Sequence, residues 1–188
     1  KNVLKVLFAG LISHYFTTDP LWIFLVAPPS GTKTELITLL SALPVVFMLS
    51  DLTTKTLFSG QVVRVGKEAP SLMMRIPNTI LTIKDFTTVL SMRSDDKMVI
   101  LSQLREIYDG KYDKAFGTGD EIHWKGRITL IAGVTGIIDA QQSLLRVMGE
   151  RFIMYRVTQP NDVDVATKAL SISGMEIEMR SELKTAMR

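Results

Sequence analysis

The chain has 188 residues, of which 46% are hydrophobic and 22% are charged, and it contains no cysteine and only two histidines, His14 and His123. This length suits one domain with a substantial core, and the residue counts exclude disulfides, thiolate metal sites and histidine-rich metal sites. The net charge of +3 is spread along the chain, so a solvated surface of mixed charge is the default interpretation, with only a slight lean toward nucleic acid.

The first half of the chain alternates helical and extended patterns. Residues 2–16 (NVLKVLFAGLISHYF) have the periodicity of an amphipathic helix. Leu21–Val26 is a short apolar run typical of a strand buried on both faces, and Lys33–Leu43 suits a helix. Two further runs, 45–49 (VVFML) and 79–83 (TILTI), predict a second and a third buried strand.

Next along the chain come a longer helix and a hairpin. Ser91–Tyr108 is predicted to be helical, with three candidates for capping its start: Ser94, Asp95 and Asp96. Residues 111–126 carry the sequence Gly-Thr-Gly-Asp at 117–120 between two short segments, which indicates a β-hairpin.

The last third of the chain completes the alternation. Residues 128–134 (ITLIAGV) and 151–157 (RFIMYRV) predict a fourth and a fifth strand, with a helix at Ile137–Met148 between them. From Asp162 onward helical segments are interrupted at Gly174. The pattern predicts an α/β fold with a mostly parallel five-stranded sheet flanked by helices. No apolar run approaches the roughly 20 residues that span a bilayer, so we expect no membrane partner.

The sequence LVAPPSGTKTELI (25–37) has the layout of a phosphate-binding loop: an apolar strand, a turn, Lys-Thr and a helix. Ala27 and Thr32 replace the two glycines of the usual pattern. A chance Gly-Thr-Lys-Thr after a Pro-Pro turn is the alternative. In a nucleotide site, the residues that contact ATP are expected to be Pro29, Ser30, Gly31, Thr32, Lys33 and Thr34.

Two expectations concern the shape of this loop. Because a β-branched residue resists positive φ, we expect Thr32 to be helical and Gly31 to take any left-handed position. We also expect Lys33 to face solvent when no nucleotide is bound.

An acid at the end of a later strand supports the nucleotide interpretation. Asp85 follows the apolar run 79–83 in the sequence TILTIKDF. In this order Thr34 and Asp85 are the expected Mg²⁺ ligands. The alternative is that Asp85 is an ordinary cap or turn residue.

The ordered motifs resemble those of AAA+ P-loop ATPases. The resemblance is to the branch with a hairpin before sensor 1: minichromosome-maintenance helicases, MoxR-type ATPases and sigma-54 activators. The minichromosome-maintenance helicases also lack the glycine before the Walker Lys, and in this chain Thr32 stands at that position. The resemblance rests on the loop at 25–37, on LSQLREIYDGKY, on AFGTGDEIHWKGRITLIAGVT and on LLRVMGERFIMYRV. More narrowly, the chain resembles uncharacterised ATP-binding proteins of phages and mobile elements.

The resemblance implies roles for further residues and a division of the chain. Lys33, Asp85, Thr135 and Arg151 would be catalytic. Thr135 stands at sensor 1, where many relatives carry Asn, and Arg151 would be an arginine finger facing a neighbouring subunit's site. Residues 1–160 would form the AAA+-like P-loop core, and residues 161–188 the start of a truncated helical lid.

The implied function is an ATP-hydrolysing ring ATPase, with ATP and Mg²⁺ as cofactors. It would form a hexamer and serve as a motor or remodelling factor in DNA replication or related DNA transactions, acting on DNA or a DNA-bound protein. The cytoplasm of a bacterium or a phage-infected host is the expected location. Lysines near the hairpin that could touch a nucleic-acid backbone are Lys111, Lys114 and Lys125.

One departure puts hydrolysis in question. Phe86 stands where AAA+ ATPases carry the Walker B glutamate. Asp51, Glu106 and Asp109 are alternative acids that could polarise the attacking water, and each also has an ordinary interpretation as a surface or cap residue. A module that binds nucleotide but hydrolyses it slowly or not at all, and a DNA-binding adaptor, are therefore kept as alternative functions.

Overall fold

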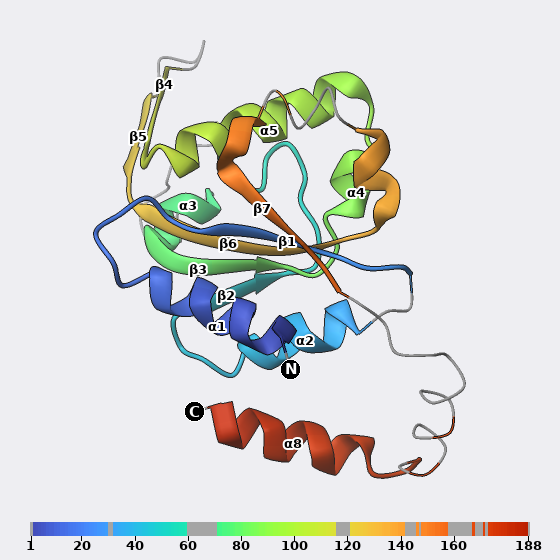
Figure 1. Ribbon diagram of the computed structural model, residues 1–188. Coiled ribbons are helices and arrows are strands. Elements are labelled where there is room, and N and C mark those ends of the chain that lie inside the picture. The colour runs from blue at the N-terminus through green and yellow to red at the C-terminus, as the bar shows by residue number, and fades with distance from the viewer. Residues whose placement is uncertain are drawn as a thin grey trace.

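The computed structural model describes residues 2–29, 32–59, 71–115, 121–141, 146, 148–157, 167, 171 and 173–187. Its centre is a sheet of five parallel strands in the order β2-β3-β6-β1-β7 (Figure 1). The strands are β1 (Trp22–Val26), β2 (Val46–Leu49), β3 (Asn78–Ile83), β6 (Arg127–Val134) and β7 (Phe152–Arg156). The prediction of an α/β fold with a five-stranded sheet is thus confirmed, and every pairing in that sheet is parallel.

Helices cover both faces of the sheet (Figure 1). One face carries α1 (Asn2–Ser13) and α2 (Lys33–Leu40). The other carries the short helices α3 (Leu72–Arg75) and α4 (Thr87–Leu90) and the longer α5 (Ser94–Tyr108). This arrangement buries both faces, as parallel sheets require.

The residues of β1 show how the sequence builds two cores. Trp22, Phe24 and Val26 point into the core beneath α3, α4 and α5, whereas Ile23 and Leu25 point into the core beneath α1 and α2. Successive side chains of a strand face opposite sides of the sheet, so a wholly apolar strand fits only between two covered faces.

Three sequence predictions need correction. Residues 46–49 form a strand, but it is only half-buried, because β2 lies at the edge of the sheet. The start of α5 has Arg93 at its N-cap with no side-chain cap, so the expected capping by Ser94, Asp95 or Asp96 is wrong. In the helix expected over Ile137–Met148, the start is instead the 3₁₀ helix η1 (Gly136–Ala140), whereas Arg146 and Met148 are α-helical; residues 142–145 and 147 lie outside the described residues.

The predicted hairpin is confirmed as β4 (Lys111–Ala115) paired antiparallel with β5 (Glu121–Lys125). Its inner face packs on the main body: the Tyr112 ring stacks on Phe58 at 3.7 Å between centroids, and the Trp124 indole donates to the Met73 carbonyl oxygen at 2.8 Å. Because β5 leads directly into the amino end of β6, the hairpin lies at the amino ends of the parallel strands, opposite their carboxyl ends (Figure 1).

The C-terminal helix α8 (Glu176–Met187) lies outside the two core layers, beyond α1 and α2 (Figure 1). Arg180 joins it to α2 through hydrogen bonds of 2.8 and 3.0 Å to the carboxylate of Glu35. Gly174 precedes α8 with a φ of +90°, a non-helical conformation at the residue where the sequence predicts an interruption of the helix. No helix in the described ranges has both the length and the apolar character that crossing a membrane requires.

Candidate functional site

The candidate site lies at the carboxyl ends of the central strands. Because β3, β6 and β1 are adjacent and parallel, the residues that follow them meet at one edge of the sheet. Asp85 follows β3, Thr135 follows β6, and the loop containing Pro28 and Pro29 follows β1. The three segments that the sequence separates by about 50 residues each are therefore brought together.

The loop after β1 leaves the sheet gradually. The Ala27 amide donates to the Val134 carbonyl oxygen at 3.1 Å, so the pairing of β1 and β6 continues past the strand, and Pro28 and Pro29 are exposed. Thr32, at the N-cap of α2, has a φ of −68°, which confirms that it avoids the left-handed region. Ser30 and Gly31 lie outside the described residues, so their predicted contacts with nucleotide stay predictions.

Lys33 is oriented differently from the expectation. Its side chain is not solvent-facing: the residue is only 6% exposed, and Nζ donates to the carbonyl oxygens of Ala27 and Pro28 at 3.2 and 3.0 Å. A desolvated ammonium group needs such acceptors, and the loop's own backbone supplies them. The lysine thus folds back over the loop, whereas Thr34, the next residue, is exposed.

Asp85 and Thr135 are linked through Thr87, a residue that the sequence analysis missed. The Asp85 carboxylate accepts the Thr87 backbone N–H at 2.9 Å, and the Thr87 hydroxyl oxygen accepts the Thr135 N–H at 3.1 Å. The two threonine hydroxyl groups lie 3.4 Å apart. This chain of contacts fixes the orientation of Asp85 and ties the ends of β3 and β6 together. An acid two residues before a threonine at a strand end is the signal that could have revealed it.

Gly133 allows this close approach of β6 to the end of β3. A Cβ atom at residue 133 would lie 2.5 Å from the Lys84 carbonyl oxygen, which no side chain tolerates. The Gly133 carbonyl oxygen also accepts the Phe86 N–H at 2.7 Å. Glycine is therefore required here by space rather than by backbone conformation.

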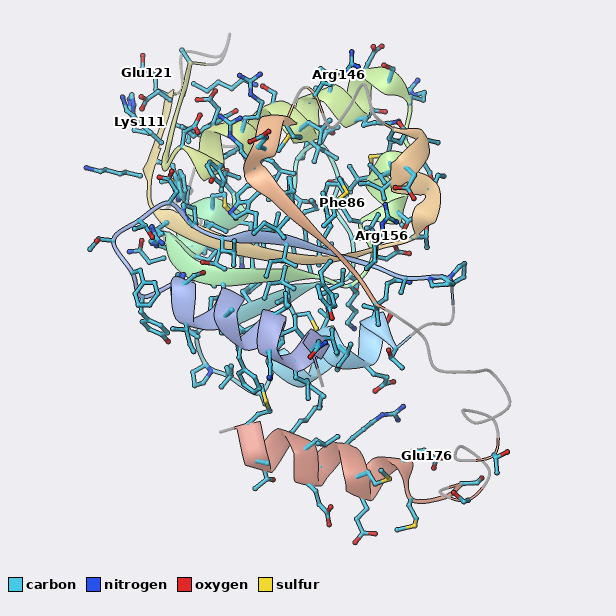
Figure 2. All side chains as sticks on the ribbon, viewed as in Figure 1. Phe86, Lys111, Glu121, Arg146, Arg156 and Glu176 are labelled. Carbon is cyan, nitrogen blue, oxygen red and sulfur yellow. The ribbon has the colours of Figure 1, made fainter. Side chains whose placement is uncertain are left out.

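Phe86 faces away from the edge of the sheet. The residue is 0% exposed, and its ring lies 5.0 Å from that of Phe24, centroid to centroid, within the core beneath α4 and α5 (Figure 2). The residue that the resemblance aligns with the Walker B glutamate is thus a core residue in this chain.

Arg151 lies just before β7, at the end of the sheet where the parallel strands begin and opposite their carboxyl ends. Its guanidinium group forms an ion pair of 3.1 Å with Asp109 and donates to the Met148 carbonyl oxygen at 3.0 Å, and it lies 5.3 Å from the centroid of the Tyr108 ring. Its Nε is buried without a hydrogen-bond partner in the described part of the chain. The expected finger is therefore occupied by contacts within its own chain, and its role toward a neighbour stays a prediction.

The three alternative acids separate by position. Asp51 follows β2 at the carboxyl edge, where the Asp85 amide donates to the Ser50 carbonyl oxygen at 3.4 Å. Glu106 and Asp109 lie at the end of α5, and Asp109 pairs with Arg151, which precedes β7 at the amino ends of the strands. Of the three, only Asp51 shares an edge with Lys33.

A cation near the loop was also missed, because it belongs to a predicted strand. Arg156, the last residue of β7, forms a bidentate ion pair with Asp139 of η1 at 2.6 and 3.1 Å. The pKa of Asp139 is lowered by this hydrogen bonding with Arg156. Arg156 also lines an open hollow of about 470 Å³ together with the residues Val26, Ala27, Pro28, Pro29, Gly136 and Val157.

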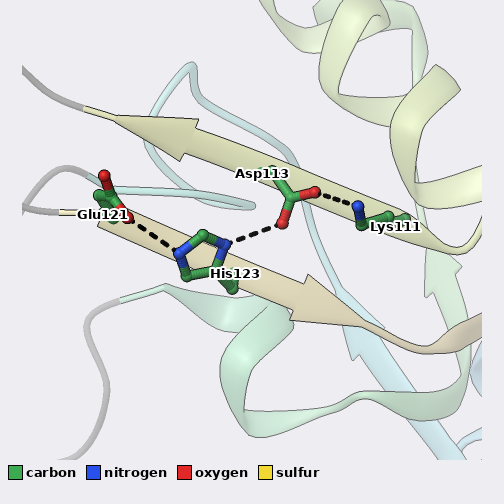
Figure 3. Close-up of polar contacts among 4 residues, drawn as sticks. All are labelled: Lys111, Asp113, Glu121 and His123. Carbon is green, nitrogen blue, oxygen red and sulfur yellow. Dashed lines mark hydrogen bonds and ion pairs between the residues drawn. The ribbon is translucent and has the colours of Figure 1, made fainter.

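The hairpin carries a separate cluster of charges on its outer face (Figure 3). His123 is hydrogen-bonded through Nδ1 to Asp113 at 2.9 Å and through Nε2 to Glu121 at 3.1 Å. Lys111 pairs with the other oxygen of Asp113 at 2.5 Å. All four groups are solvent-exposed and far from the candidate site.

This cluster leads to a pH prediction. Asp113 first, and then Glu121, raise the pKa of His123 above its usual 6.5, while Lys111 and His123 lower the pKa of Asp113. The His123 contribution to stability is therefore full below pH 6.5 and lost as the pH rises through the higher folded value; that of Asp113 is lost as the pH falls through its depressed one. A titration of His123 by NMR is expected to give a pKa above 6.5.

The matched variants of that titration are Asp113→Asn and Glu121→Gln. Asp113→Asn is expected to lower the His123 pKa more than Glu121→Gln does, because Asp113 is the larger cause of the shift. Equal titration of His123 in all three proteins would contradict the contacts seen at the hairpin.

The residues at the carboxyl edge fit a magnesium–nucleotide site rather than a metal held by protein alone. No group of three or more His, Cys, Asp or Glu side chains placed to hold a metal occurs within the described ranges. Mg²⁺ commonly takes one or two protein oxygens and completes its shell with phosphates and water. Asp85 offers its exposed carboxylate, whose Oδ1 alone is hydrogen-bonded among the described residues, and Thr34 an exposed hydroxyl group.

Comparison of the sequence with models of known protein families finds no match, and comparison with curated proteins finds no relative.

Proposed function

We propose that this chain binds ATP with Mg²⁺ at the carboxyl edge of its sheet and is an ATPase of the AAA+ type. The observation that carries the proposal is the placement of Lys33, Asp85 and Thr135 in the segments that follow three adjacent parallel strands, at one end of the sheet. Ligands of open α/β sheets bind at this edge, and the start of α2 adds the positive end of a helix dipole for an anion.

Each residue has a role in this proposal. Lys33 would leave the carbonyl oxygens of Ala27 and Pro28 for the terminal phosphates, and its ammonium group would neutralise their charge. Thr34 and Asp85 would hold Mg²⁺. Thr135, held by Thr87, would orient groups around the terminal phosphate.

The rate of hydrolysis is where a second candidate function arises. Residue 86 is a phenylalanine packed in the core, so it cannot polarise the attacking water. Asp51, which follows β2 at the carboxyl ends of the strands, is the candidate acid. The second candidate is therefore a module that binds nucleotide, assembles, and hydrolyses slowly or not at all. Phosphate release measured with and without single- and double-stranded DNA, beside mass photometry with ATP, distinguishes a DNA-stimulated hexameric ATPase from that module.

The direct test of the site is Asp85→Asn. Asparagine keeps the oxygen that accepts the Thr87 N–H, so the local structure should persist, but it removes the charge that attracts Mg²⁺. We expect titration with a fluorescent ATP analogue to show that the variant loses the Mg²⁺-dependent part of binding and keeps the metal-free part.

Asp95→Asn, an exposed acid in the first turn of α5, is the matched control and should bind like the parent. Equal losses with and without Mg²⁺ in Asp85→Asn would mean that Asp85 only holds the end of β3. Absence of any ATP binding by the parent chain would reject the proposed function.

A further inference from the structure

Arg156 is a cation at the same edge of the sheet as the proposed nucleotide loop. β7 pairs with β1 in parallel, and the register places Arg156 opposite Val26, the last residue before the loop. The Val157 amide continues this pairing by donating to the Val26 carbonyl oxygen at 2.9 Å. The position of the Arg156 backbone is thus fixed relative to the start of the loop.

The side chain of Arg156 lies on the face of the sheet that Thr135 and η1 occupy. Phe152 and Met154 of β7 pack in the core beneath α4 and α5, and alternation along the strand places Arg156 on that face. Its bidentate contact with Asp139, four residues after Thr135, agrees with this placement. The guanidinium group therefore lies beside the hollow formed by the loop after β1 and the loop after β6.

The pair with Asp139 is poorly protected. The side chains of Arg156 and Asp139 are 58% and 53% exposed. Solvent-exposed ion pairs contribute little to stability, because water screens the charges and two long side chains lose freedom. A multiply charged anion in the hollow could therefore compete with Asp139 for Arg156, whose planar fork suits phosphate oxygens as well as carboxylate oxygens.

Resting on the proposed function, we propose that Arg156 is a phosphate-binding residue that acts on the nucleotide of its own chain, and that Asp139 is the counter-ion it exchanges for the terminal phosphate. Arg151 cannot take this role in its own chain, since it lies at the other end of β7 and is held by Asp109. Arg151 precedes β7 and Arg156 is its last residue, so the two arginines lie at opposite ends of the same strand.

This assignment predicts opposite effects for the two partners. Arg156→Ala removes a charged donor, so ATP should bind roughly tenfold more weakly. ADP, which lacks the terminal phosphate, should lose less than about threefold. Asp139→Asn removes the competing carboxylate, so ATP should bind about threefold more tightly or better. The double variant should bind ATP like Arg156→Ala alone, since Asp139 acts only through Arg156.

The experiment is a titration of fluorescent ATP and ADP analogues in Mg²⁺ with the parent, Arg156→Ala, Arg156→Lys, Asp139→Asn and the double variant. Arg105→Ala, an exposed arginine in the last turn of α5, is the control and should bind both nucleotides like the parent. Arg156→Lys keeps the charge but loses the fork, and should fall between the parent and Arg156→Ala for ATP. Circular dichroism of each variant confirms that the fold is intact.

The outcomes separate two failures. If the parent binds ATP and Lys33→Ala binds it much more weakly, but Arg156→Ala binds ATP like the parent, Arg156 is only a surface ion-pair partner and the inference is wrong. Equal weakening of ATP and ADP would also overturn it, because the contact would not be with the terminal phosphate. If the parent binds no nucleotide, the proposed function fails and the inference fails with it.

Discussion

Lys33→Ala is expected to weaken ATP binding by roughly a hundredfold, because it removes a charged donor to the terminal phosphates, and such bonds are worth ~1.5–3 kcal/mol. The burial of Lys33 adds a second effect. Its Nζ bonds to Ala27 and Pro28 are lost as well, so the free energy of unfolding should fall by about 1 kcal/mol. Nucleotide titration measures the first effect and urea denaturation the second.

Lys5→Ala, on the exposed side of α1, is the matched control for the loss of one positive charge. It should change neither ATP affinity nor stability appreciably. Unchanged ATP binding by Lys33→Ala, with the fold shown to be intact, would reject the phosphate-loop interpretation, leaving a Pro-Pro turn whose lysine only closes its own loop.

Phe86→Glu, which would create the Asp-Glu pair of the family that the sequence resembles, is expected to destabilise the protein rather than to accelerate ATP hydrolysis. Residue 86 is 0% exposed and packs against Phe24, so the carboxyl group would lie in an apolar core. The loss of the ring and the burial of an acid should lower the free energy of unfolding by roughly 3 kcal/mol or more. Urea denaturation monitored by circular dichroism measures this change.

Phe86→Leu is the control that keeps an apolar side chain, and it should cost about 1 kcal/mol. The rate of phosphate release should not rise in either variant. A Phe86→Glu protein that is as stable as the parent and hydrolyses ATP faster would show that residue 86 turns toward the nucleotide, contrary to the packing described above.

Local patterns sufficed to predict the strands but not their neighbours. The runs at Leu21–Val26 and 45–49 look alike in sequence, yet the first lies inside the sheet and the second at its edge. The strand order depends on which distant segments cover each face, and periodicity within a window of ten residues carries no such information. The start of the helix expected at Ile137–Met148 was misjudged for a similar reason, since it adopts the tighter 3₁₀ form against α4.

The candidate site divides in the same way. Lys33 and Asp85 could be proposed because each follows an apolar strand at a spacing that a known motif shares. Arg156 could not, since a strand arginine is an ordinary residue until the fold brings it beside Asp139. The signal for Thr87 is only its position two residues after Asp85, and its contact with Thr135 depends on the fold. The inward rotation of Lys33 depends on two backbone carbonyl oxygens whose direction the sequence does not encode locally.

The central position of β1 has a consequence for how the chain comes together. The Trp22 indole donates to the Ile128 carbonyl oxygen of β6 at 2.7 Å, across 106 residues of sequence. The two strands that pair with β1 are β6 and β7, and β7 follows β6 in the chain. At a synthesis rate of ~5–20 residues per second, an apolar segment made early waits roughly 5–20 s for its first partner. During that interval the helices made before β6 can cover the faces of β1, but its backbone N–H and C=O groups have no native strand to pair with, so the strand is a target for chaperones and for self-association.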